Sequence, residues 1–269
     1  MLDFLHAITL EQFHVLIGIW VVINVLTGLP IYIGKMMPMS GRLGDTPLSL
    51  LGDINKKAAW INKKAAWIIM EIPVLIVVLG VYFYTAESFN FSAVMVAAFC
   101  VHYVNRALIY PYRIKADGKT MPVMIMLFSM IFYMVNGVII GFYFGALKSY
   151  SIEWLSDPRF IIGAVLFVVG LVINIQSDNI LLNLRKPGET GYKIPQGGMF
   201  KYVSSPHYMG EMIEWIGFAI MTWSIPGLAY AFTVIVPLFG QARNSHQWYI
   251  DTFKDEYPKE RKAIIPGLL

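Results

Sequence analysis

Charge and cysteine are both scarce in this 269-residue sequence. Charged residues make up 14% of the chain and hydrophobic residues 57%, whereas soluble domains carry roughly 25% charged residues. The single cysteine, Cys100, excludes an internal disulfide and a cysteine metal cluster, and we expect no metal site. The sequence also lacks a P-loop, an HExxH motif and a GxGxxG motif after a strand, which excludes Walker and Rossmann folds.

Two further absences concern the N-terminus and the partners of the chain. "MLDFLHAITLEQF" has neither a basic segment nor a small-residue cleavage site, so we expect this N-terminus to be retained rather than removed as a signal peptide. The pI is about 9.0, but basic loops are normal on the cytoplasmic side of membrane proteins. The basic charge therefore does not indicate a nucleic-acid partner.

Long apolar runs are abundant. Crossing a bilayer takes about 20 mostly apolar residues, and several runs of the chain are long enough. We predict an all-α integral membrane protein with seven transmembrane helices, folded as a single domain over residues 1–269. The last two spans are separated only by "SIP" and should form a tight hairpin. The predicted spans are 14–34, 67–84, 92–112, 122–146, 160–181, 207–223 and 226–242.

The basic residues predict how the chain lies in the membrane. Eighteen lysines and arginines fall in loops 35–66, 113–121 and 182–206 and in the tail, whereas Lys148 and Arg159 lie on the opposite side. The positive-inside rule then gives an outer N-terminus and a cytoplasmic C-terminus. An odd number of spans requires the two termini to lie on opposite sides, so the span count agrees with the charge bias.

The heptad "INKKAAW" occurs twice in succession over residues 54–67. At this spacing Lys56 and Lys63, and Trp60 and Trp67, fall near one another on a helix. We interpret the segment as lying at the level of the lipid headgroups, which Trp and Lys favour. A local duplication without function is an equal alternative.

Polar side chains interrupt several spans. An ionisable side chain costs at least ~2.5–3.5 kcal/mol at the bilayer centre, so it usually faces the protein interior and marks function. "WIIMEIPVLIVV" carries Glu71 among apolar residues and a proline. Except for Asn136, these polar side chains lie in the inner half or nearer the middle of their spans, which predicts a polar pocket that opens toward the cytoplasm. They are Glu71, His102, Tyr103, Arg106, Asn136, Asn174, Asp178, His207, Glu211 and Glu214.

Each of these residues also has a simpler interpretation. Glu71 lies near the end of its span and can reach the interface, Tyr103 can serve packing, and His207 can be a solvated cap. Arg106 can form structural ion pairs with acidic residues of the fifth and sixth spans. The number of such residues in one leaflet favours the functional interpretation.

The segment between the fifth and sixth spans, "RKPGETGYKIPQGGMFKYVSSPHYMGE", is rich in glycine, proline and basic residues. Glycine permits a close backbone approach, and Arg and Lys suit phosphate groups. We interpret it as a loop that covers an anionic cofactor. An ordinary basic cytoplasmic loop is the equal alternative on composition alone.

Several longer stretches carry a family resemblance. "INIQSDNILLNLRKPGETGYKIPQGGMFKYVSSPHYMGEMIEWIGFAIMTWSIP", the tail "FKDEYPKERKAIIPGLL", and the upstream pieces "AAWIIMEIP" and "VHYVNR" closely resemble the steroid 5α-reductase family. Members of this family are NADPH-dependent membrane enzymes that reduce the C4–C5 double bond of 3-oxo-steroids such as testosterone and progesterone. The resemblance starts at about residue 58 and is densest over 171–227 and 248–266. It implies a seven-helix fold, which the charge bias also supports.

The resemblance implies that Glu71 and Tyr103 face the 3-oxo group of the steroid. Together they would hydrogen-bond the enone carbonyl while hydride passes from the nicotinamide to the β-carbon. Donors aimed at an oxygen that gains negative charge stabilise the transition state. Glu71 donates only when it is protonated; an ionised Glu71 that orients the Tyr103 hydroxyl is the alternative.

The resemblance also implies NADPH as the cofactor, with most of its ligands in residues 120–269. Acidic and amide side chains would accept from ribose hydroxyls or the carboxamide, and basic side chains would face the phosphates. The expected cofactor residues are Asn174, Asp178, Arg185, Lys186, Tyr192, His207, Glu211, Arg243, His246, Tyr249, Arg106 and Lys119. A flat apolar slot for the steroid is expected from Trp67, Phe132, Trp215 and Phe218.

The chain departs from the family pattern in places. Met70 stands where family members carry glutamine, and "QARNSHQWY" has Gln241 and a single His246 where the animal enzymes carry an arginine and paired histidines. Arg243 is positioned to replace that arginine through a shift of two residues. These departures concern the substrate and the contacts of the tail more than the reaction.

Four other functions compete with a steroid reductase. They are a reductase of another enone or polyprenol lipid, an S-adenosylmethionine-dependent membrane methyltransferase, an ion-coupled transporter and a non-catalytic sterol-binding protein. A methyltransferase does not need the upstream pair Glu71 and Tyr103, and a transporter usually shows internal repeats. We expect a steroid or other lipid enone as the partner, in a bacterial inner membrane or the endoplasmic reticulum, and family analogy favours a monomer.

Overall fold

A computed structural model describes residues 8–32, 59–114, 118–186, 189 and 191–268. Within these ranges the chain forms seven long helical segments and one two-stranded ribbon. The elements are α2 (Leu10–Tyr32), β1 (Trp60–Asn62), α4 (Lys63–Thr85), α5 (Ser92–Tyr103), the π-helix η1 (Val104–Ile109), α6 (Tyr110–Arg113), β2 (Thr120–Pro122), α7 (Val123–Phe142), the π-helix η2 (Tyr143–Leu147), η3 (Ile152–Ser156), α8 (Pro158–Leu182), η4 (Gly198–Lys201), α9 (Pro206–Thr222), α10 (Ile225–Phe253) and η5 (Lys254–Glu256).

The helices occupy the predicted spans, and the prediction of an all-α multi-span protein is confirmed at that level. Six of the described segments are long and apolar enough to cross a membrane. The seventh, α9, has 17 residues and packs against α8 and α10. The chain is therefore a multi-pass integral membrane protein. The six segments are 10–27, 63–85, 92–113, 123–147, 158–182 and 225–256.

The structure differs from the prediction in two places, at the end of the last helix and in the repeated heptad. The last helix, α10, continues to Phe253 instead of ending at 242, because no glycine or proline interrupts the chain between Gly240 and Pro258. The repeated heptad does not form one helix. Trp60 lies in β1, half exposed, whereas Trp67 is buried in α4.

The ribbon explains why the heptad splits. β1 pairs antiparallel with β2, with Trp60 opposite Pro122. Asn62 then caps α4, because its side chain accepts hydrogen bonds from the backbone N–H groups of Lys64 and Ala65. The two tryptophans therefore do not share a helix, and that expectation is wrong; Lys56 lies outside the described residues.

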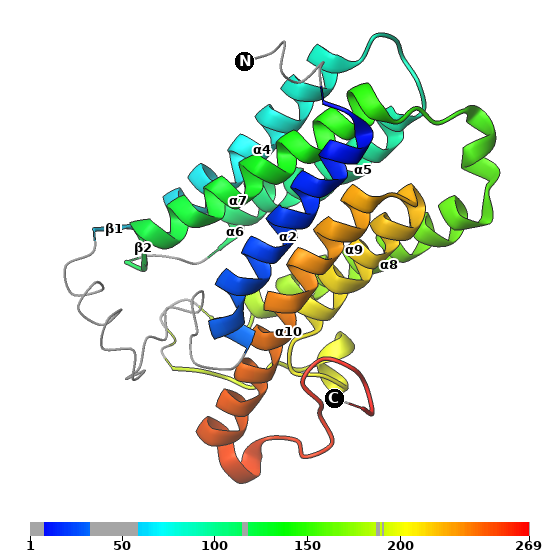
Figure 1. Cartoon of the computed structure of the whole chain (residues 1–269). Coiled ribbons are helices and arrows are strands. Elements are labelled where there is room, and N and C mark those ends of the chain that lie inside the picture. Colours follow the sequence, from blue (N-terminus) through cyan, green and yellow to red (C-terminus); the bar gives the residue numbers. More distant parts are fainter. Residues whose placement is uncertain (1–7, 33–58, 115–117, 187–188, 190, 269) are drawn as a thin grey trace.

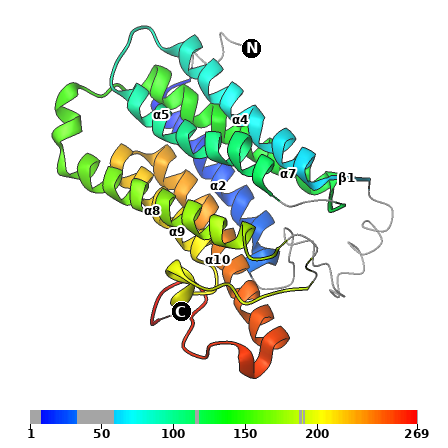
Figure 2. The same ribbon diagram turned by 180° about the vertical axis from the view of Figure 1, so that it is seen from behind.

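The helices form two groups (Figures 1 and 2). α4, α5 and α7 lie side by side in one group and α8, α9 and α10 in the other, and α2 runs along α10 beside α7. The ribbon, the segment after α8 and the C-terminal tail lie toward one end of the bundle, which we call the ribbon end. The connections 86–91 and 148–157 lie at the opposite end.

Glycines bring α8 and α9 into backbone contact. A Cβ atom added to Gly170 would lie 2.3 Å from the Glu214 nitrogen, and one added to Gly210 would lie 2.5 Å from the Asn174 nitrogen. Such distances are too short for any side chain, so only glycine allows this approach. Membrane helices commonly use small residues in this way. The contact sets Asn174 opposite Gly210 and Glu214 opposite Gly170 across the seam.

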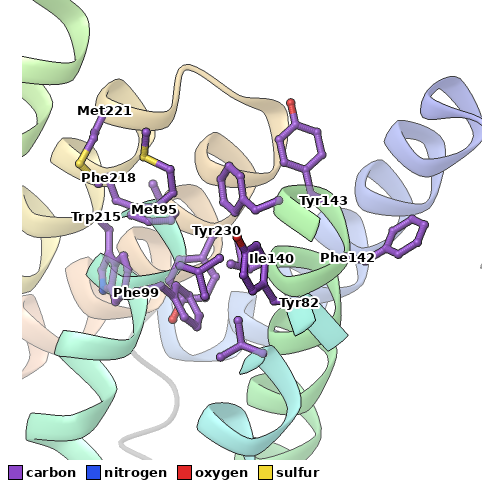
Figure 3. Close-up of a cluster of buried hydrophobic side chains, with 14 of the residues drawn as sticks. Tyr82, Met95, Phe99, Ile140, Phe142, Tyr143, Trp215, Phe218, Met221 and Tyr230 are labelled. Carbon is purple, nitrogen blue, oxygen red and sulfur yellow. The ribbon is translucent and has the colours of Figure 1, made fainter. Parts of the chain in front are cut away.

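An aromatic core fills the space between the two groups (Figure 3). Phe99 of α5, Trp215 and Phe218 of α9 and Tyr230 of α10 converge there. The ring centroids of Trp215 and Tyr230 lie 4.6 Å apart with an interplanar angle of 80°, an edge-to-face arrangement that aromatic rings favour. Tyr103 belongs to this core, and the His102 ring packs on Trp215.

Outside the bundle, Asp157 caps α8. Its carboxylate accepts from the side chain of Arg159 at 2.7–2.9 Å and from the Arg159 backbone N–H at 2.8 Å. These hydrogen bonds, led by the side-chain ones, lower the pKa of Asp157 to about 2. The cap satisfies a backbone donor that the first turn of a helix would otherwise leave free.

Candidate active site

Glu71 faces the protein interior, not the interface. It lies in the third turn of α4 and is 1% exposed. Neither carboxylate oxygen meets hydrogen-bond geometry with any residue that the structure describes, although the Tyr133 hydroxyl of α7 lies close enough to interact with the carboxylate. Arg106 and His102 also lie within electrostatic range of it. The interpretation of Glu71 as a snorkelling surface residue is therefore wrong.

Tyr103 ends α5 and is 1% exposed. Its hydroxyl is hydrogen-bonded to the hydroxyl of Tyr230. Its ring packs on Phe99 with centroids 4.9 Å apart and on Tyr133 with centroids 5.6 Å apart. Glu71 is among the charges that act on its hydroxyl, so the two residues from separate spans meet in one buried cluster.

Arg106 lies on η1, where the helix after Tyr103 winds as a π-helix. π-helical turns are rare and occur frequently at functional sites. The guanidinium carbon lies 4.7 Å from the centre of the Trp67 ring and 5.0 Å from that of Tyr110, within cation–π range. Its Nη1 lies 3.5 Å from Oδ2 of Asp178, so the predicted ion pair with the fifth span is present.

Asn174 and His207 leave two polar atoms free at the α8–α9 seam. The Asn174 amide nitrogen donates to the backbone oxygen of His207 at 2.9 Å. Asn174 Oδ1 and His207 Nδ1 are both buried and have no hydrogen-bond partner within the described part of the chain. Buried polar atoms are nearly always paired in folded proteins, which makes this pair a candidate contact for a bound group.

His102 and Glu214 form a second buried pair. His102 Nδ1 lies 3.0 Å from Oε1 of Glu214, and their side chains are 3% and 0% exposed. The pair ties α5 to α9, and the His102 ring packs on Trp215 with centroids 4.6 Å apart. Glu211 lies one turn earlier on α9, and its charge acts on Glu71, Asp178 and Arg106. Both acidic residues of α9 therefore face the same interior.

The four expected substrate residues lie on two sides of this cluster. Trp215 and Phe218 belong to the aromatic core. Phe132 stacks on Tyr230 with centroids 6.4 Å apart. Trp67 is buried in a smaller cluster toward the ribbon, where it meets Tyr110 edge to face. Tyr103 belongs to the same core as Trp215 and Phe218, whereas Glu71 follows Met70, which packs with Trp67.

The remaining expected cofactor residues lie at the ribbon end or beyond it. Lys119 and Lys186 are exposed, and so is Arg243. Arg185 Nη1 donates to the Gly191 backbone oxygen at 3.3 Å. Tyr192 meets Trp248 of α10, with ring centroids 4.9 Å apart. The loop after α8 is thereby held against the extended part of α10.

The C-terminal tail is fastened to the start of α9. Ser204 Oγ is hydrogen-bonded to His246 Nδ1 and to the Tyr257 hydroxyl, both at 2.6 Å, and to the Lys262 backbone oxygen at 3.0 Å. Tyr249 stacks on Tyr257 with centroids 5.4 Å apart. His246 contacts Ser204 through one ring nitrogen, and its expected contact with the cofactor stays a prediction.

Three residues in or near the cluster were not expected as site residues. Tyr230 and Tyr133 sit in apolar runs, where a tyrosine usually means packing, and nothing in the sequence distinguishes them. Glu214 was expected in the polar pocket, where it shares the helical face of Glu211, but without a role of its own. Arg261 is 4% exposed and donates to Gln196 at 2.9 Å, while its Nε and Nη1 lack partners among the residues described.

A groove of about 790 Å³ opens elsewhere, between α4, α5 and α8. Its lining is almost wholly apolar, for example Leu79, Phe83, Val101 and Ile175, and contains none of the expected site residues. Lipid chains fill such a surface in a bilayer. The buried polar cluster is the better candidate because it concentrates charged groups whose burial is costly.

Known proteins place the chain in a family. Residues 119–269 match the family described as 3-oxo-5-alpha-steroid 4-dehydrogenase. The chain belongs to this family. It is 44% identical over 217 residues to the human protein named 3-oxo-5-alpha-steroid 4-dehydrogenase 1, covering 79% of this chain and 80% of that one.

Two other relatives agree. The chain is 47% identical to the bovine 3-oxo-5-alpha-steroid 4-dehydrogenase 1 over 178 residues, covering 66% of this chain and 68% of the relative. It is 45% identical to the human 3-oxo-5-alpha-steroid 4-dehydrogenase 2 over 175 residues, covering 65% and 68%. The predicted steroid 5α-reductase family is confirmed, and the protein is a membrane oxidoreductase of that family.

The site can be tested for its fit to the nicotinamide cofactor that the family implies. Asn174 Oδ1 is a buried acceptor with no partner among the described residues, suited to an amide or hydroxyl donor. Arg261 in the tail has two guanidinium nitrogens that find no partner in the same described part of the chain, and Arg185 lies in the loop after α8. Free acceptors at the seam and basic groups nearer the tail match a ligand with a polar head and phosphates.

Proposed function

We propose that this protein reduces the C4–C5 double bond of 3-oxo-Δ4-steroids to 5α-dihydro products, with NADPH as the reductant. One observation carries the proposal. Glu71 and Tyr103, from different helices, are both 1% exposed, and the Glu71 carboxylate lies near enough for its charge to act on the Tyr103 hydroxyl. A member of the family that had lost this pair would still match the family, so membership alone does not carry the proposal.

The roles of the two residues follow from their chemistry. The Tyr103 hydroxyl donates a hydrogen bond to the 3-oxo oxygen, which gains negative charge as the double bond is reduced. Glu71 either donates to the same oxygen in its protonated form or orients the Tyr103 hydroxyl as a carboxylate. Aromatic walls from Trp215, Phe132 and Phe218 exclude water, which strengthens both interactions.

NADPH, when bound, supplies the hydride for the reduction. Asn174, Asp178, His207 and Glu211 lie along the α8–α9 seam and would hold its polar head. Arg185 and Arg261 would face its phosphates, with Tyr192 and Tyr249 nearby. Arg106 lies between the two halves, paired with Asp178 and above Trp67, so it would orient both partners.

The basic loops support an orientation with the N-terminus outside and the C-terminus in the cytoplasm. In this orientation the ribbon end faces the cytoplasm, where NADPH is available. Residues 1–269 would form one domain, in which 120–269 hold most of the cofactor ligands.

The proposal is tested with purified protein in detergent. Progesterone or testosterone is added with NADPH, and the 5α-dihydro product is identified by chromatography and mass spectrometry. Glu71→Gln and Tyr103→Phe should each lower kcat by roughly 10²–10³, the loss typical of one donor to a developing oxyanion. NADPH affinity should be unchanged.

Glu153→Gln is the matched control, because Glu153 is exposed in η3, in the connection at the end of the bundle opposite the ribbon. It should keep wild-type turnover. Product formation at the wild-type rate in both site variants would refute the assignment. An absence of product with NADPH bound would keep a reductase but exclude these steroids, and an absence of NADPH binding would refute the function.

A further inference from the structure

The hydroxyl of Tyr230 is hydrogen-bonded to the hydroxyl of Tyr103. It lies in the second turn of α10 and is 2% exposed. Its ring is fixed on three sides, by Trp215 at 4.6 Å, Phe99 at 5.2 Å and Phe132 at 6.4 Å between centroids. Packing of this kind fixes the position of the hydroxyl oxygen. A tyrosine that only fills space does not need a side-chain partner for its hydroxyl and can bond water or a backbone oxygen instead.

The donor count gives this hydrogen bond a direction. A tyrosine hydroxyl carries one O–H and can also accept. If Tyr103 donates its proton to a substrate oxygen, it cannot also donate to Tyr230. The Tyr230 hydroxyl must then be the donor of their shared hydrogen bond, and Tyr103 both accepts and donates.

We propose that Tyr230 is a positioning residue for the reaction: its hydroxyl donates to the Tyr103 oxygen and aims the Tyr103 O–H at the 3-oxo group of the substrate. This inference rests on the proposed function and extends it to a third hydroxyl. A relay of this kind strengthens the outer bond, because hydrogen bonds in a chain polarise one another. It also keeps Tyr103 from turning toward other acceptors.

The geometry separates this role from that of Tyr133. Tyr133 lies on α7 and faces the Glu71 carboxylate, whereas Tyr230 lies on α10 and faces the Tyr103 hydroxyl. Each member of the predicted carbonyl-binding pair therefore has its own tyrosine behind it. Of the two contacts, only that of Tyr230 is a hydrogen bond in the structure, so it carries the inference.

The test uses Tyr230→Phe, which removes the hydroxyl and keeps the packed ring. We expect kcat to fall about tenfold, with KM for the steroid and Kd for NADPH changed by less than about twofold. Tyr150→Phe is the matched control. Tyr150 is also buried in the aromatic core, and its hydroxyl donates to the Thr222 backbone oxygen at 2.5 Å. The Tyr150→Phe variant should lower Tm as much as Tyr230→Phe does, without changing kcat.

A double-mutant cycle asks whether Tyr230 acts through Tyr103. In the Tyr103→Phe background, Tyr230→Phe should cause no further loss of kcat, because no hydroxyl is left to aim. Independent structural effects would multiply instead. Multiplicative losses, or an unchanged kcat in Tyr230→Phe, would overturn the inference.

A spectroscopic readout serves where turnover is too slow to measure. The 5α-dihydro 3-oxo steroid, labelled with ¹³C at C3, is bound to the protein and its carbonyl stretch is recorded by difference infrared spectroscopy. Hydrogen bonding lowers this frequency, so Tyr230→Phe should fall between wild type and Tyr103→Phe.

The same spectrum separates the two hypotheses. If wild type and Tyr103→Phe give the same band, or if wild type does not bind the ketone, the proposed function fails and the inference fails with it. If Tyr103→Phe shifts the band but Tyr230→Phe does not, only the inference about Tyr230 is overturned.

Discussion

The α8–α9 and α4–α7 pairs use glycine in different ways. Along α8–α9, glycines on both helices bring backbones together at similar distances, 2.2 Å for a Cβ added to Gly163, 2.3 Å at Gly170 and 2.4 Å at Gly217. Along α4–α7 the glycines that contact the partner helix within these two helices lie only on α7. The α4 backbone lies 2.7 Å from a Cβ added to Gly141, and this distance widens to 3.3 Å at Gly137, nearer the ribbon end.

This difference matches the two tasks of the site. The uniform α8–α9 seam carries Asn174, Asp178 and Glu211, the proposed ligands of a cofactor of fixed shape. The widening α4–α7 pair leaves room at the ribbon end for large side chains around Glu71, on the side proposed for the substrate. We infer a rigid cofactor side, held by backbone contact, and a substrate side held by side chains that can repack.

The largest loss of stability among the variants that test this difference is expected from Gly170→Ala. The added methyl group meets the backbone of α9, which cannot move without separating the helices, so we expect a loss of about 3 kcal/mol, the upper part of the range for overpacking. Thermal unfolding in detergent measures it. Wild-type stability would mean that the seam is more pliable than its distances indicate.

A pair of variants should separate the two sides. Asp178→Asn keeps its shape but removes a charged acceptor, and we expect NADPH Kd to rise about tenfold with steroid KM unchanged. Phe132→Ala opens the aromatic wall and should raise steroid KM about tenfold with NADPH Kd unchanged. Titration of NADPH fluorescence and steady-state kinetics give both constants. Equal effects of either change on both ligands would contradict the division.

The gradient along α4–α7 is tested within one helix. Gly141→Ala brings a methyl group against the Val78 backbone oxygen and should cost about 1 kcal/mol. A Cβ added to Gly137 would lie 3.2 Å from Val77 Cγ1 and 3.3 Å from the Val74 backbone oxygen, distances that shifts of a few tenths of an ångström relieve, so Gly137→Ala should cost less than half of that. Unfolding temperatures of the two variants, compared directly, would contradict the gradient if their order were reversed.

The smallest effect is expected at Gly80, where no atom lies within 4 Å of an added Cβ. Gly80→Ala keeps α4 intact and removes a residue of low helix propensity, so stability should be unchanged or rise by up to roughly 1 kcal/mol. This variant is the control for the other glycines. A clear loss of stability would show that α4 makes a contact on its lipid-facing side.

The sequence predicts the helices well because apolar runs of bilayer length have few alternative folds. It predicts Glu71 and Tyr103 only through family resemblance, since a lone polar residue in a span has several interpretations. Asn136 illustrates the limit. It was the exception among the polar residues of the spans, and no sequence pattern shows that its amide donates to the Phe132 backbone oxygen of its own helix at 2.8 Å.

Contacts between distant spans are harder still to predict. Tyr230 follows Tyr103 by 127 positions, and no local pattern links their hydroxyls. The ribbon β1–β2 also escapes prediction, because its three-residue strands are too short for periodicity to show. Both depend on how the helices pack, which the order of residues along one helix does not reveal.

The π-helix η1 marks one place where this protein can change length during evolution. A π turn holds about one more residue than an α turn, so one residue lost between 104 and 109 would rewind η1 as an α-helix and leave α6 nearly in phase with α5. One residue lost from α5 itself would instead turn everything after it by roughly 100°, and Arg113 would leave Asn179, to which it donates a hydrogen bond. Single-residue deletions should therefore be tolerated in η1 and in the loop beyond Arg113, while α5 keeps its length.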